Sequence, residues 1–402
     1  MYNCNLAVDH AAKDQIREFM HNTGKSTMIR RFNLHIAQSE LDDLKERIRK
    51  VRWPDEIENS NWQFGTSLSY LKELSNYWEQ NFDWRKVENT INSIPNFITE
   101  VDHHKIHFLH IKSKNKNAIP LLITHGWPGS FLEMLKIIPL LTSSKEVSFD
   151  LVIPSIIGFG FSEKSSKGGV DYSFVADLWH KLMISLGYQK YGLQGGDLGA
   201  GISIRLAQQH PKNIIGLHLN YISDSYQPYL TEDIDNETQQ YKTYLKSWNE
   251  KEAAYALIQS TKPLSLAYGL NDSPIGLCAW IIEKFNAWSD NNGNIENSFT
   301  KDELLANVSL YWFTQTIHSS IRIYHETSLK PLVFKENDFV HLPVGFANFP
   351  KEIPVPPRKY IEKGFNIVRW TEMPKGGHFA AFEEPELLSA DVTAFFKKII
   401  GS

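Results

Sequence analysis

The sequence is poor in cysteine and has no excess of positive charge. Its 402 residues include two cysteines, Cys4 and Cys278, which argues against a disulfide-stapled fold and a cysteine-based metal site. Lysine and arginine number 42 against 46 aspartate and glutamate residues, for a formal net charge of −4. This balance offers no long basic surface for a phosphate backbone, so nucleic acid is not expected as a partner.

Long hydrophobic runs are also missing. The segment from Met1 to Thr23 mixes charged and polar residues and lacks the apolar stretch of a secretory signal or membrane anchor. No other apolar segment approaches the ~20 residues that a bilayer-spanning helix needs. The sequence therefore predicts a soluble, cytoplasmic protein, with residues 1–28 as an N-terminal extension of unassigned role.

The remaining composition is that of a globular protein with many aromatic rings. Hydrophobic residues make up 42% of the chain and charged residues 22%, which predicts one large buried core with one or two smaller additions. The chain has 11 Trp, 16 Tyr and 23 Phe. These rings suit an apolar ligand pocket and equally suit core packing, so they do not distinguish between the two.

Residues 29–97 have the pattern of an accessory helical segment that precedes the main core. Ser39 is the predicted N-cap of one helix, because apolar residues follow it at helical spacing. A second helix is predicted from Ser67 to Trp78. Pro54 and Pro95 mark changes of chain direction, since proline does not continue a helix.

From about residue 98, short apolar runs alternate with helical stretches. This alternation is typical of βαβ units around a mostly parallel sheet whose strands are covered on both faces. Residues 224–335 interrupt it with helical sequence, which predicts a cap inserted between two parts of an α/β core, 98–223 and 336–402. The predicted strands are Ile106–Phe108, Pro120–Thr124, Asp150–Pro154, Tyr191–Gln194, Ile215–Leu219, Phe339–Val344 and Asn366–Thr371.

A glycine-rich turn lies between a predicted strand and a predicted helix. Residues Gly195–Gly199 read GGDLG, which is the pattern of a nucleophile elbow with small residues two before and two after the nucleophile. Small residues are needed there because neighbouring backbones approach a strained turn. Asp197 then occupies the nucleophile position, although the motif alone equally fits a glycine-rich turn with a capping aspartate.

A second motif, His125–Ser130, directly follows the predicted strand Pro120–Thr124. In folds with a nucleophile elbow, the loop at this position donates a backbone N–H to the oxyanion, and the residue after the nucleophile donates a second. The predicted oxyanion hole therefore consists of the Trp127 and Leu198 amides.

A histidine and an acid complete the chain order of nucleophile, acid and histidine that this arrangement requires. His378 follows two glycines after the last predicted strand, and Glu352 lies in the loop after the preceding strand. A single histidine among 15 is more often structural, and a loop glutamate is by default a solvated surface group. The position of His378 reverses that expectation, so we predict it as the base and Glu352 as the acid that orients it.

Together these motifs resemble the microsomal-type epoxide hydrolase family, from about residue 29 to the C-terminus, with Trp53-Pro54 similar to the N-terminal meander of that family. The resemblance implies an α/β-hydrolase fold with an inserted helical cap. It also implies two cap tyrosines that hold the epoxide oxygen, which match Tyr255 and Tyr324 here. The matching stretches are His125–Ser130, Gly158–Ser162, Gly195–Asp197, Leu270–Leu277, Phe349–Glu352 and Gly376–Pro385.

Tyr268 and Tyr311 are alternatives for either tyrosine, because a tyrosine in a cap helix often serves only packing. We expect His125, Pro128 and Phe159, which lie in the matching motifs, to line the substrate pocket.

Two departures from the family pattern have consequences. Leu198 stands where the family commonly has tryptophan, but leucine retains the backbone amide, so the oxyanion hole is expected to survive in a pocket of changed shape. The membrane-anchoring N-terminal segment of the mammalian members is missing, which predicts a soluble relative.

These residues predict a two-step opening of a small apolar epoxide. An aspartate carboxylate is ionised at neutral pH, so Asp197 can attack the strained carbon without a base. Phenols stay protonated at neutral pH and can give a proton to the developing alkoxide, the expected part of Tyr255 and Tyr324. Water activated by His378, which Glu352 orients, then cleaves the ester and releases a vicinal diol.

Three alternatives use the same sequence differently. A haloalkane dehalogenase has the same nucleophile, base and acid, but that family holds the halide with an indole after the nucleophile, where this chain has Leu198. A serine esterase would need serine at the elbow. A non-catalytic hydrolase-fold protein that binds an apolar ligand is the alternative outside enzymes, and the joint presence of Asp197, Glu352 and His378 argues against it.

No cofactor is expected, because the sequence has neither a phosphate-binding glycine loop nor a metal-ligand cluster. The adjacent His103 and His104 are interpreted as exposed polarity at a strand edge. The residues leave open whether the protein is a homodimer. They also leave open whether it serves detoxification, hormone turnover or carbon-source use.

Overall fold

The computed structural model describes residues 28–230 and 234–401, and its centre is a mostly parallel sheet. Within these residues the sheet has nine strands in the order β1-β2-β3-β5-β4-β6-β7-β8-β9. The pairs β1–β2, β2–β3 and β3–β5 are antiparallel. All pairs from β5 onward in this order are parallel, namely β5–β4, β4–β6, β6–β7, β7–β8 and β8–β9. The strands are β1 (Arg30–Arg31), β2 (Asn96–Val101), β3 (His104–Ile111), β4 (Ile119–Thr124), β5 (Phe149–Pro154), β6 (Tyr191–Gly195), β7 (Ile214–Leu219), β8 (Val340–Asn348) and β9 (Phe365–Glu372).

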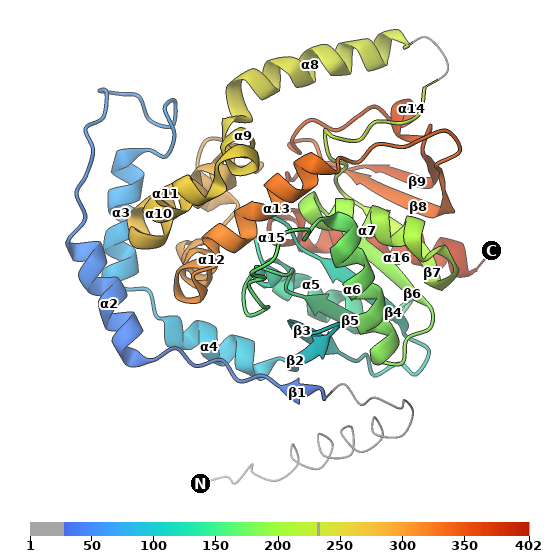
Figure 1. The fold of residues 1–402 in the computed structure, drawn as a ribbon, viewed down its shortest axis with the longest axis horizontal. Helices are drawn as coiled ribbons and strands as arrows, with labels where there is room; N and C mark the ends of the chain where they lie inside the picture. Colours follow the sequence, from blue (N-terminus) through green and yellow to red (C-terminus); the bar gives the residue numbers. More distant parts are fainter. Residues whose placement is uncertain (1–27, 231–233, 402) are drawn as a thin grey trace.

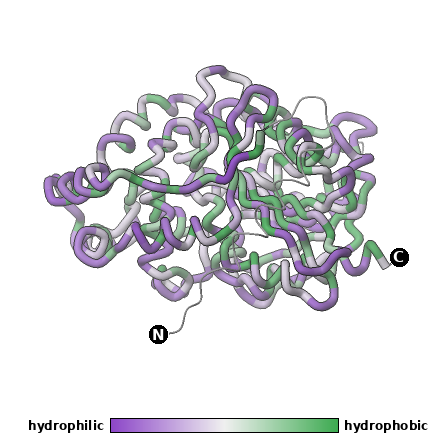
Figure 2. The backbone as a smooth tube through the Cα atoms, turned by 90° about the horizontal axis from the view of Figure 1, so that it is seen from below, coloured by the Kyte–Doolittle hydropathy of each residue, from purple (hydrophilic) through white to green (hydrophobic). Residues whose placement is uncertain are grey.

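Helices cover both faces of this sheet (Figure 1), as the continuous apolar strands require. α6 packs on α7 over one face, and α5 packs on α16 over the other. Figure 2 shows hydrophobic segments gathered in the centre of the molecule and hydrophilic ones around its rim. The core helices are α5 (Ile137–Thr142), α6 (Tyr172–Ser185), α7 (Asp197–Gln209), α14 (Arg358–Ile361), α15 (Ala380–Glu383) and α16 (Pro385–Ile400), with the 3₁₀ helices η2 (Phe131–Lys136) and η3 (Pro211–Asn213).

The helices between β7 and β8 form a second layer above the sheet, which we interpret as the predicted cap. α9, α10 and α13 pack together, and α11 and α12 contact the N-terminal helices α2 and α3, so the first helices brace the cap (Figure 1). A buried hydrogen bond from Trp78 Nε1 to Ser309 Oγ, 3.0 Å long, joins α3 to α12. The helices outside the core are α2 (Gln38–Arg49), α3 (Leu68–Gln80), α4 (Trp84–Ser93), α8 (Asn236–Glu252), α9 (Ala254–Thr261), α10 (Pro263–Asp272), α11 (Pro274–Ala287), η4 (Ile295–Asn297), α12 (Lys301–Thr314) and α13 (Ile317–Leu329).

The mostly parallel sheet is confirmed, and each predicted strand coincides with an observed one. Ser67 is the N-cap of α3, but the prediction of Ser39 as an N-cap is wrong. α2 begins at Gln38, with Ala37 in the cap position and no side-chain cap hydrogen bond. Apolar spacing misplaced this end because the first turn of α2 is polar and exposed, so it carries no periodic signal.

Two strands at the antiparallel edge were not predicted. β1 has two residues, and β2 begins at Asn96, directly after the proline that we interpreted as a change of direction. His103 lies in the tight turn between β2 and β3, with a φ of 68°. The proposed N-terminal extension lies outside the described residues except for residue 28. Among the helices that are described, none combines the length and the apolar character needed to cross a membrane.

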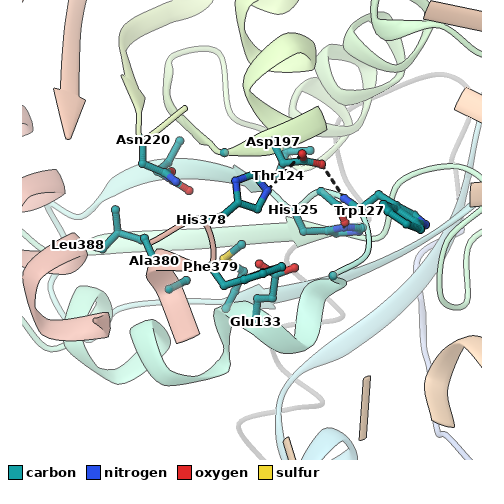
Figure 3. A pocket seen from close by; sticks show the side chains of 16 residues that line it. Thr124, His125, Trp127, Glu133, Asp197, Asn220, His378, Phe379, Ala380 and Leu388 are labelled. Atoms are coloured by element: carbon teal, nitrogen blue, oxygen red, sulfur yellow. Dashed lines mark hydrogen bonds and ion pairs between the residues drawn. The ribbon is translucent and has the colours of Figure 1, made fainter. Parts of the chain in front are cut away.

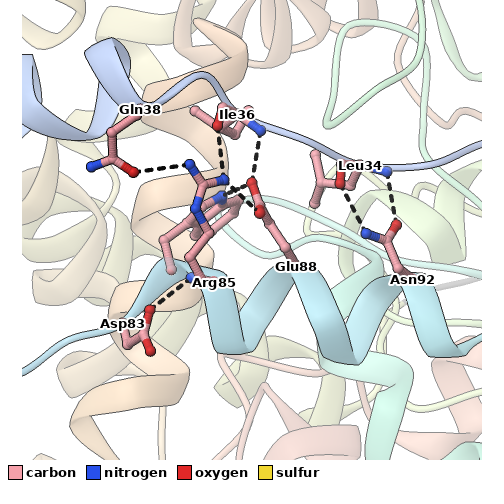
Figure 4. A network of polar contacts seen from close by, with 8 residues as sticks. Leu34, Ile36, Gln38, Asp83, Arg85, Glu88 and Asn92 are labelled. Atoms are coloured by element: carbon pink, nitrogen blue, oxygen red, sulfur yellow. Dashed lines mark hydrogen bonds and ion pairs between the residues drawn. The ribbon is translucent and has the colours of Figure 1, made fainter.

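A buried carboxylate ties the incoming chain to α4 (Figure 4). Glu88 is 5% exposed, and its Oε1 accepts hydrogen bonds from the Ile36 amide at 2.7 Å and from Trp84 Nε1 at 3.0 Å. Its Oε2 lies 2.6 Å from Arg85 Nη1, which also donates to the Ile36 carbonyl. One turn along α4, the side-chain amide of Asn92 accepts a hydrogen bond from the Leu34 N–H and donates one to the Leu34 carbonyl. These contacts fix the extended segment that enters α2.

Replacing Glu88 by Ala leaves the Ile36 and Trp84 donors without their acceptor. We expect the free energy of unfolding to fall by about 1–3 kcal/mol, measured as a lower midpoint of urea unfolding. The control is Glu46→Ala, which breaks an exposed ion pair with Lys50 and should cost under about 1 kcal/mol. Equal midpoints for the two variants would contradict the importance of the buried network.

Candidate active site

The candidate residues meet where the parallel strands end. The carboxyl ends of adjacent parallel strands lie at one edge of a sheet, which is where α/β folds bind ligands. Asp197 follows β6, the His125–Ser130 loop follows β4, and Glu352 and His378 follow β8 and β9. Because β4, β6, β7, β8 and β9 follow one another in the sheet, segments that lie far apart in the chain converge on one site (Figure 3).

Asp197 occupies the predicted sharp turn between β6 and α7. Its φ of 46° lies in the left-handed region, a conformation that costs a non-glycine residue about 1–3 kcal/mol and often occurs at functional sites. Gly199 allows this turn to pack closely, since a Cβ there would lie 2.0 Å from the Thr124 carbonyl oxygen. The turn lifts the Asp197 side chain off the end of the sheet and toward the loop that follows β4.

The loop after β4 holds the Asp197 carboxylate. The Trp127 amide donates to Asp197 Oδ1 at 2.7 Å, as Figure 3 shows. Gly126 makes room for this contact, because a Cβ at that position would lie 2.2 Å from the same oxygen. Leu198 is the second residue of α7, so its amide is one of those that a helix leaves without an intrahelical partner.

His378 lies between two carboxylates. Its Nδ1 is 2.5 Å from Glu352 Oε1, and its Nε2 is 3.3 Å from Asp197 Oδ2. Burial by itself lowers the pKa of His378, but the Glu352 and Asp197 carboxylates outweigh it and raise this pKa well above its usual value. The imidazole is therefore held by Glu352 in the orientation that directs Nε2 to Asp197.

The loop that carries His378 is fixed by the cap. The His378 amide donates to the Trp288 carbonyl at 2.9 Å, and the Gly376 amide donates to Asp290 Oδ2 at 3.0 Å. The Trp288 and Tyr221 rings meet the imidazole edge to face, with centroids 5.1 and 5.5 Å away. Sequence reasoning missed these two rings, because nothing in their local sequence distinguishes them from other aromatic core residues.

Tyr255 and Tyr324, on α9 and α13, pack on the Trp127 indole from above. The Tyr255 ring is stacked on it at 5.5 Å, and the Tyr324 ring meets it edge to face at 5.7 Å. Burial, with the Asp197 carboxylate adding to it, raises the pKa of Tyr255 well above its usual value; burial and Tyr255 do the same for Tyr324. Both phenols are therefore protonated at neutral pH. Lys284 places its Nζ 4.6 Å from the centre of the Tyr255 ring.

The other two candidate tyrosines lie elsewhere. Tyr311 is buried, and its hydroxyl donates to the Gly129 carbonyl at 2.7 Å, so it supports the loop after β4. Tyr268 is 72% exposed on α10.

A small cavity of about 20 Å³ lies on the sheet side of Asp197 and His378. His125 lines it, but both nitrogens of that ring contact backbone atoms, those of Gly126 and Ile156, and burial lowers the pKa of His125 to about 4. Pro128 and Phe159 are buried but are not among the residues that line this cavity. The lining residues are Thr124, His125, Gly126, Trp127, Gly129, Glu133, Met134, Gln194, Gly196, Asp197, Asn220, His378, Phe379, Ala380, Ala381 and Leu388.

The fold and this site define an α/β-hydrolase-fold enzyme, and residues 119–264 match the family described as "alpha/beta hydrolase fold". Residues 29–134 match the family described as "Epoxide hydrolase N terminus". The chain is 39% identical to epoxide hydrolase 1 of Sus scrofa, over 91% of this chain and 88% of that relative. The chain therefore belongs to the epoxide hydrolase family, and the predicted resemblance is confirmed.

Solved structures of this family have the same architecture. The juvenile hormone epoxide hydrolase of the silkworm Bombyx mori matches with a TM-score of 0.84 and 31% identity, over 93% of this chain and 95% of that one. The epoxide hydrolase of Aspergillus niger matches with a TM-score of 0.82 and 32% identity, over 93% of this chain and 97% of that one. The roles of the individual site residues stay predictions.

Replacing Asp197 by Asn keeps the shape of the side chain and removes its charge. Because the carboxylate helps to raise the pKa of His378, we expect the imidazole of the variant to lose its proton at a lower pH than in the wild type. Nuclear magnetic resonance of the ring protons across a pH series measures this. Asp177→Asn, which faces His210 instead, is the control and should leave the His378 titration in place. An unchanged titration in Asp197→Asn would contradict the coupling.

Proposed function

We propose that the protein converts apolar epoxides to vicinal diols through a covalent ester on Asp197. The observation that carries this proposal is the placement of one carboxylate between the Trp127 amide, at 2.7 Å, and His378 Nε2, at 3.3 Å. A carboxylate that accepts a hydrogen bond on one oxygen and faces the His378 imidazole with the other is arranged both to attack the epoxide and to be released from the ester. The surrounding aromatic side chains make the substrate site apolar.

In the first step, Asp197 Oδ2 attacks one carbon of the epoxide. An O–C bond forms, the ring C–O bond breaks, and the electron pair goes to the ring oxygen. Tyr255 or Tyr324 gives its proton to that oxygen, since both phenols are protonated at neutral pH and pack over the Trp127 indole. The products of this step are a hydroxyalkyl ester and one tyrosinate.

In the second step, water attacks the carboxyl carbon of the ester. Forming the ester removes the Asp197 charge, and with it one of the causes that raise the pKa of His378. The imidazolium then gives its proton to the tyrosinate and becomes a base that can take a proton from water, and Glu352 stabilises the imidazolium that forms again. The Trp127 and Leu198 amides meet the oxyanion, where one such donor is commonly worth about 3–4 kcal/mol. The bond between the carboxyl carbon and the substrate oxygen breaks, the departing alkoxide takes the second proton of the water, and the diol leaves the restored Asp197 carboxylate and His378 imidazolium.

A single turnover in ¹⁸O-labelled water tests the covalent route. With styrene oxide as the probe, we expect the label in the peptide that contains Asp197, because the diol takes its new oxygen from the carboxylate and the carboxylate takes its own from water. Mass spectrometry of the digest detects it, and Asp197→Asn is the control that forms neither label nor diol. Label in the diol alone would contradict the ester. A bromoalkane assayed in parallel tests the dehalogenase alternative.

Replacing Tyr255 or Tyr324 by Phe removes one proton donor and leaves the ring packing on Trp127. We expect each variant to form the ester at least about tenfold more slowly and the double variant to lose about 10²–10⁴-fold, the usual span of general acid catalysis. Stopped-flow or rapid-quench kinetics measures this. Tyr268→Phe, at the exposed position on α10, is the control. Unchanged ester formation in the double variant would remove both phenols from the mechanism.

A further inference from the structure

Glu133 presents a buried carboxyl that the two steps above do not use. It belongs to η2 and is 8% exposed. Its Oε1 accepts from the Ser130 amide at 2.9 Å as half of a capping box. Among the hydrogen bonds of the described residues, none ends on its Oε2. The side chain lines the same cavity as Asp197 and His378, and Figure 3 shows it directed into that space from the opposite side.

The cavity has the size and the polar lining of a site for one water molecule. Its volume of about 20 Å³ exceeds the roughly 10–15 Å³ that one water needs. Thr124 Oγ1 and Gln194 Oε1 are buried there without a hydrogen-bond partner among the described residues, and His378 Nε2 has only its ion-pair contact with Asp197 Oδ2. Buried polar atoms are almost always bonded to protein or to ordered water, and a bound water needs two to four such partners. Together with Glu133 Oε2, these atoms provide that number.

Gly129 leaves the space that the Glu133 carboxyl occupies. A Cβ on Gly129 would lie 1.3 Å from Glu133 Oε1, so only glycine at position 129 accommodates the side chain in this orientation. Burial raises the pKa of Glu133 to about 8; His378 opposes the shift and Asp197 adds to it. Most of the carboxyl is therefore neutral at pH 7, which avoids a second negative charge beside the nucleophile. A neutral carboxyl can both donate and accept a hydrogen bond.

We propose that Glu133 is a positioning residue that holds, in this cavity, the water that His378 activates. The inference rests on the proposed function, because it concerns the second step alone. The water gives one proton to His378 Nε2 and hydrogen-bonds Glu133 Oε2, which leaves an oxygen lone pair directed at the carboxyl carbon of residue 197. No proton is transferred to Glu133. The residue thus acts on ester hydrolysis and not on ester formation.

The test separates the two steps in Glu133→Met, a variant of similar volume without a polar end. Rapid-quench experiments with styrene oxide, read by mass spectrometry of the peptide around residue 197, give the rates of ester formation and decay. We expect formation within about twofold of wild type and decay at least about tenfold slower, equal to ~1.4 kcal/mol of barrier, so that ester accumulates. Glu133→Gln, whose amide can still bond water, should decay at a rate between the two.

Glu46→Met is the control, because Glu46 is an exposed glutamate of α2 that pairs with Lys50 and does not line the cavity. It should change neither rate. Decay at the wild-type rate in Glu133→Met overturns the inference. Equal slowing of both steps also overturns it, since that marks a displaced oxyanion loop. A wild-type enzyme that never forms an ester is a distinct outcome, which rejects the proposed function and this inference with it.

Discussion

The contact between the Trp127 amide and the Asp197 carboxylate is the constraint on which the rest of the site depends. It exists because two chain reversals, after β4 and after β6, approach each other more closely than side chains permit. Gly126 and Gly199 provide the space, and Asp197 accepts a left-handed φ to turn its side chain toward the amide. The local cost of that backbone conformation is offset by the buried, parallel strands on either side, which cannot shift without breaking the sheet. The rigid sheet thus maintains the strained backbone conformation of the proposed nucleophile.

In the proposed mechanism, the charges around this contact control the order of the two steps. Glu352, His378 and Asp197 form a buried row in which a cation lies between two anions. Such a row stabilises the protonated imidazole and keeps it from acting as a base while the nucleophile is free. Esterification converts the Asp197 anion to a neutral group. Only Glu352 then opposes the effect of burial, which favours the neutral ring, so the pKa of His378 falls. In the proposed mechanism, His378 therefore becomes available as a base when there is an ester to hydrolyse, without a movement of the backbone.

Much of this arrangement could be predicted from sequence, because the elements that carry it are local. Strand positions follow from apolar runs, and the elbow, the loop after β4 and the histidine each lie within a few residues of a strand end. What sequence could not provide is the set of contacts made by distant, ordinary residues. Trp288 and Tyr221 pack on His378 from different layers. Glu133 looks like a capping residue, and only the three-dimensional arrangement shows that the rest of its carboxyl faces the cavity. The start of α2 was misplaced for the related reason that a solvated first turn has no apolar period.

In the proposed mechanism, the cap holds reacting groups in place as well as covering the site. Asn307 and Tyr311 of α12 bond the carbonyls of Pro128 and Gly129, which fixes the loop that donates the oxyanion amide. The Trp288 carbonyl, just after α11, accepts from the amide of His378, which fixes the base. Any displacement of the cap that moved the phenols away from Asp197 would therefore also disturb the amide and the imidazole. Both steps of the proposed reaction need the phenols, the amide and the imidazole at fixed positions relative to one another. The contacts of α11 and α12 with the N-terminal helices therefore stabilise the geometry of the reacting atoms, although no residue of the N-terminal helices lines the cavity.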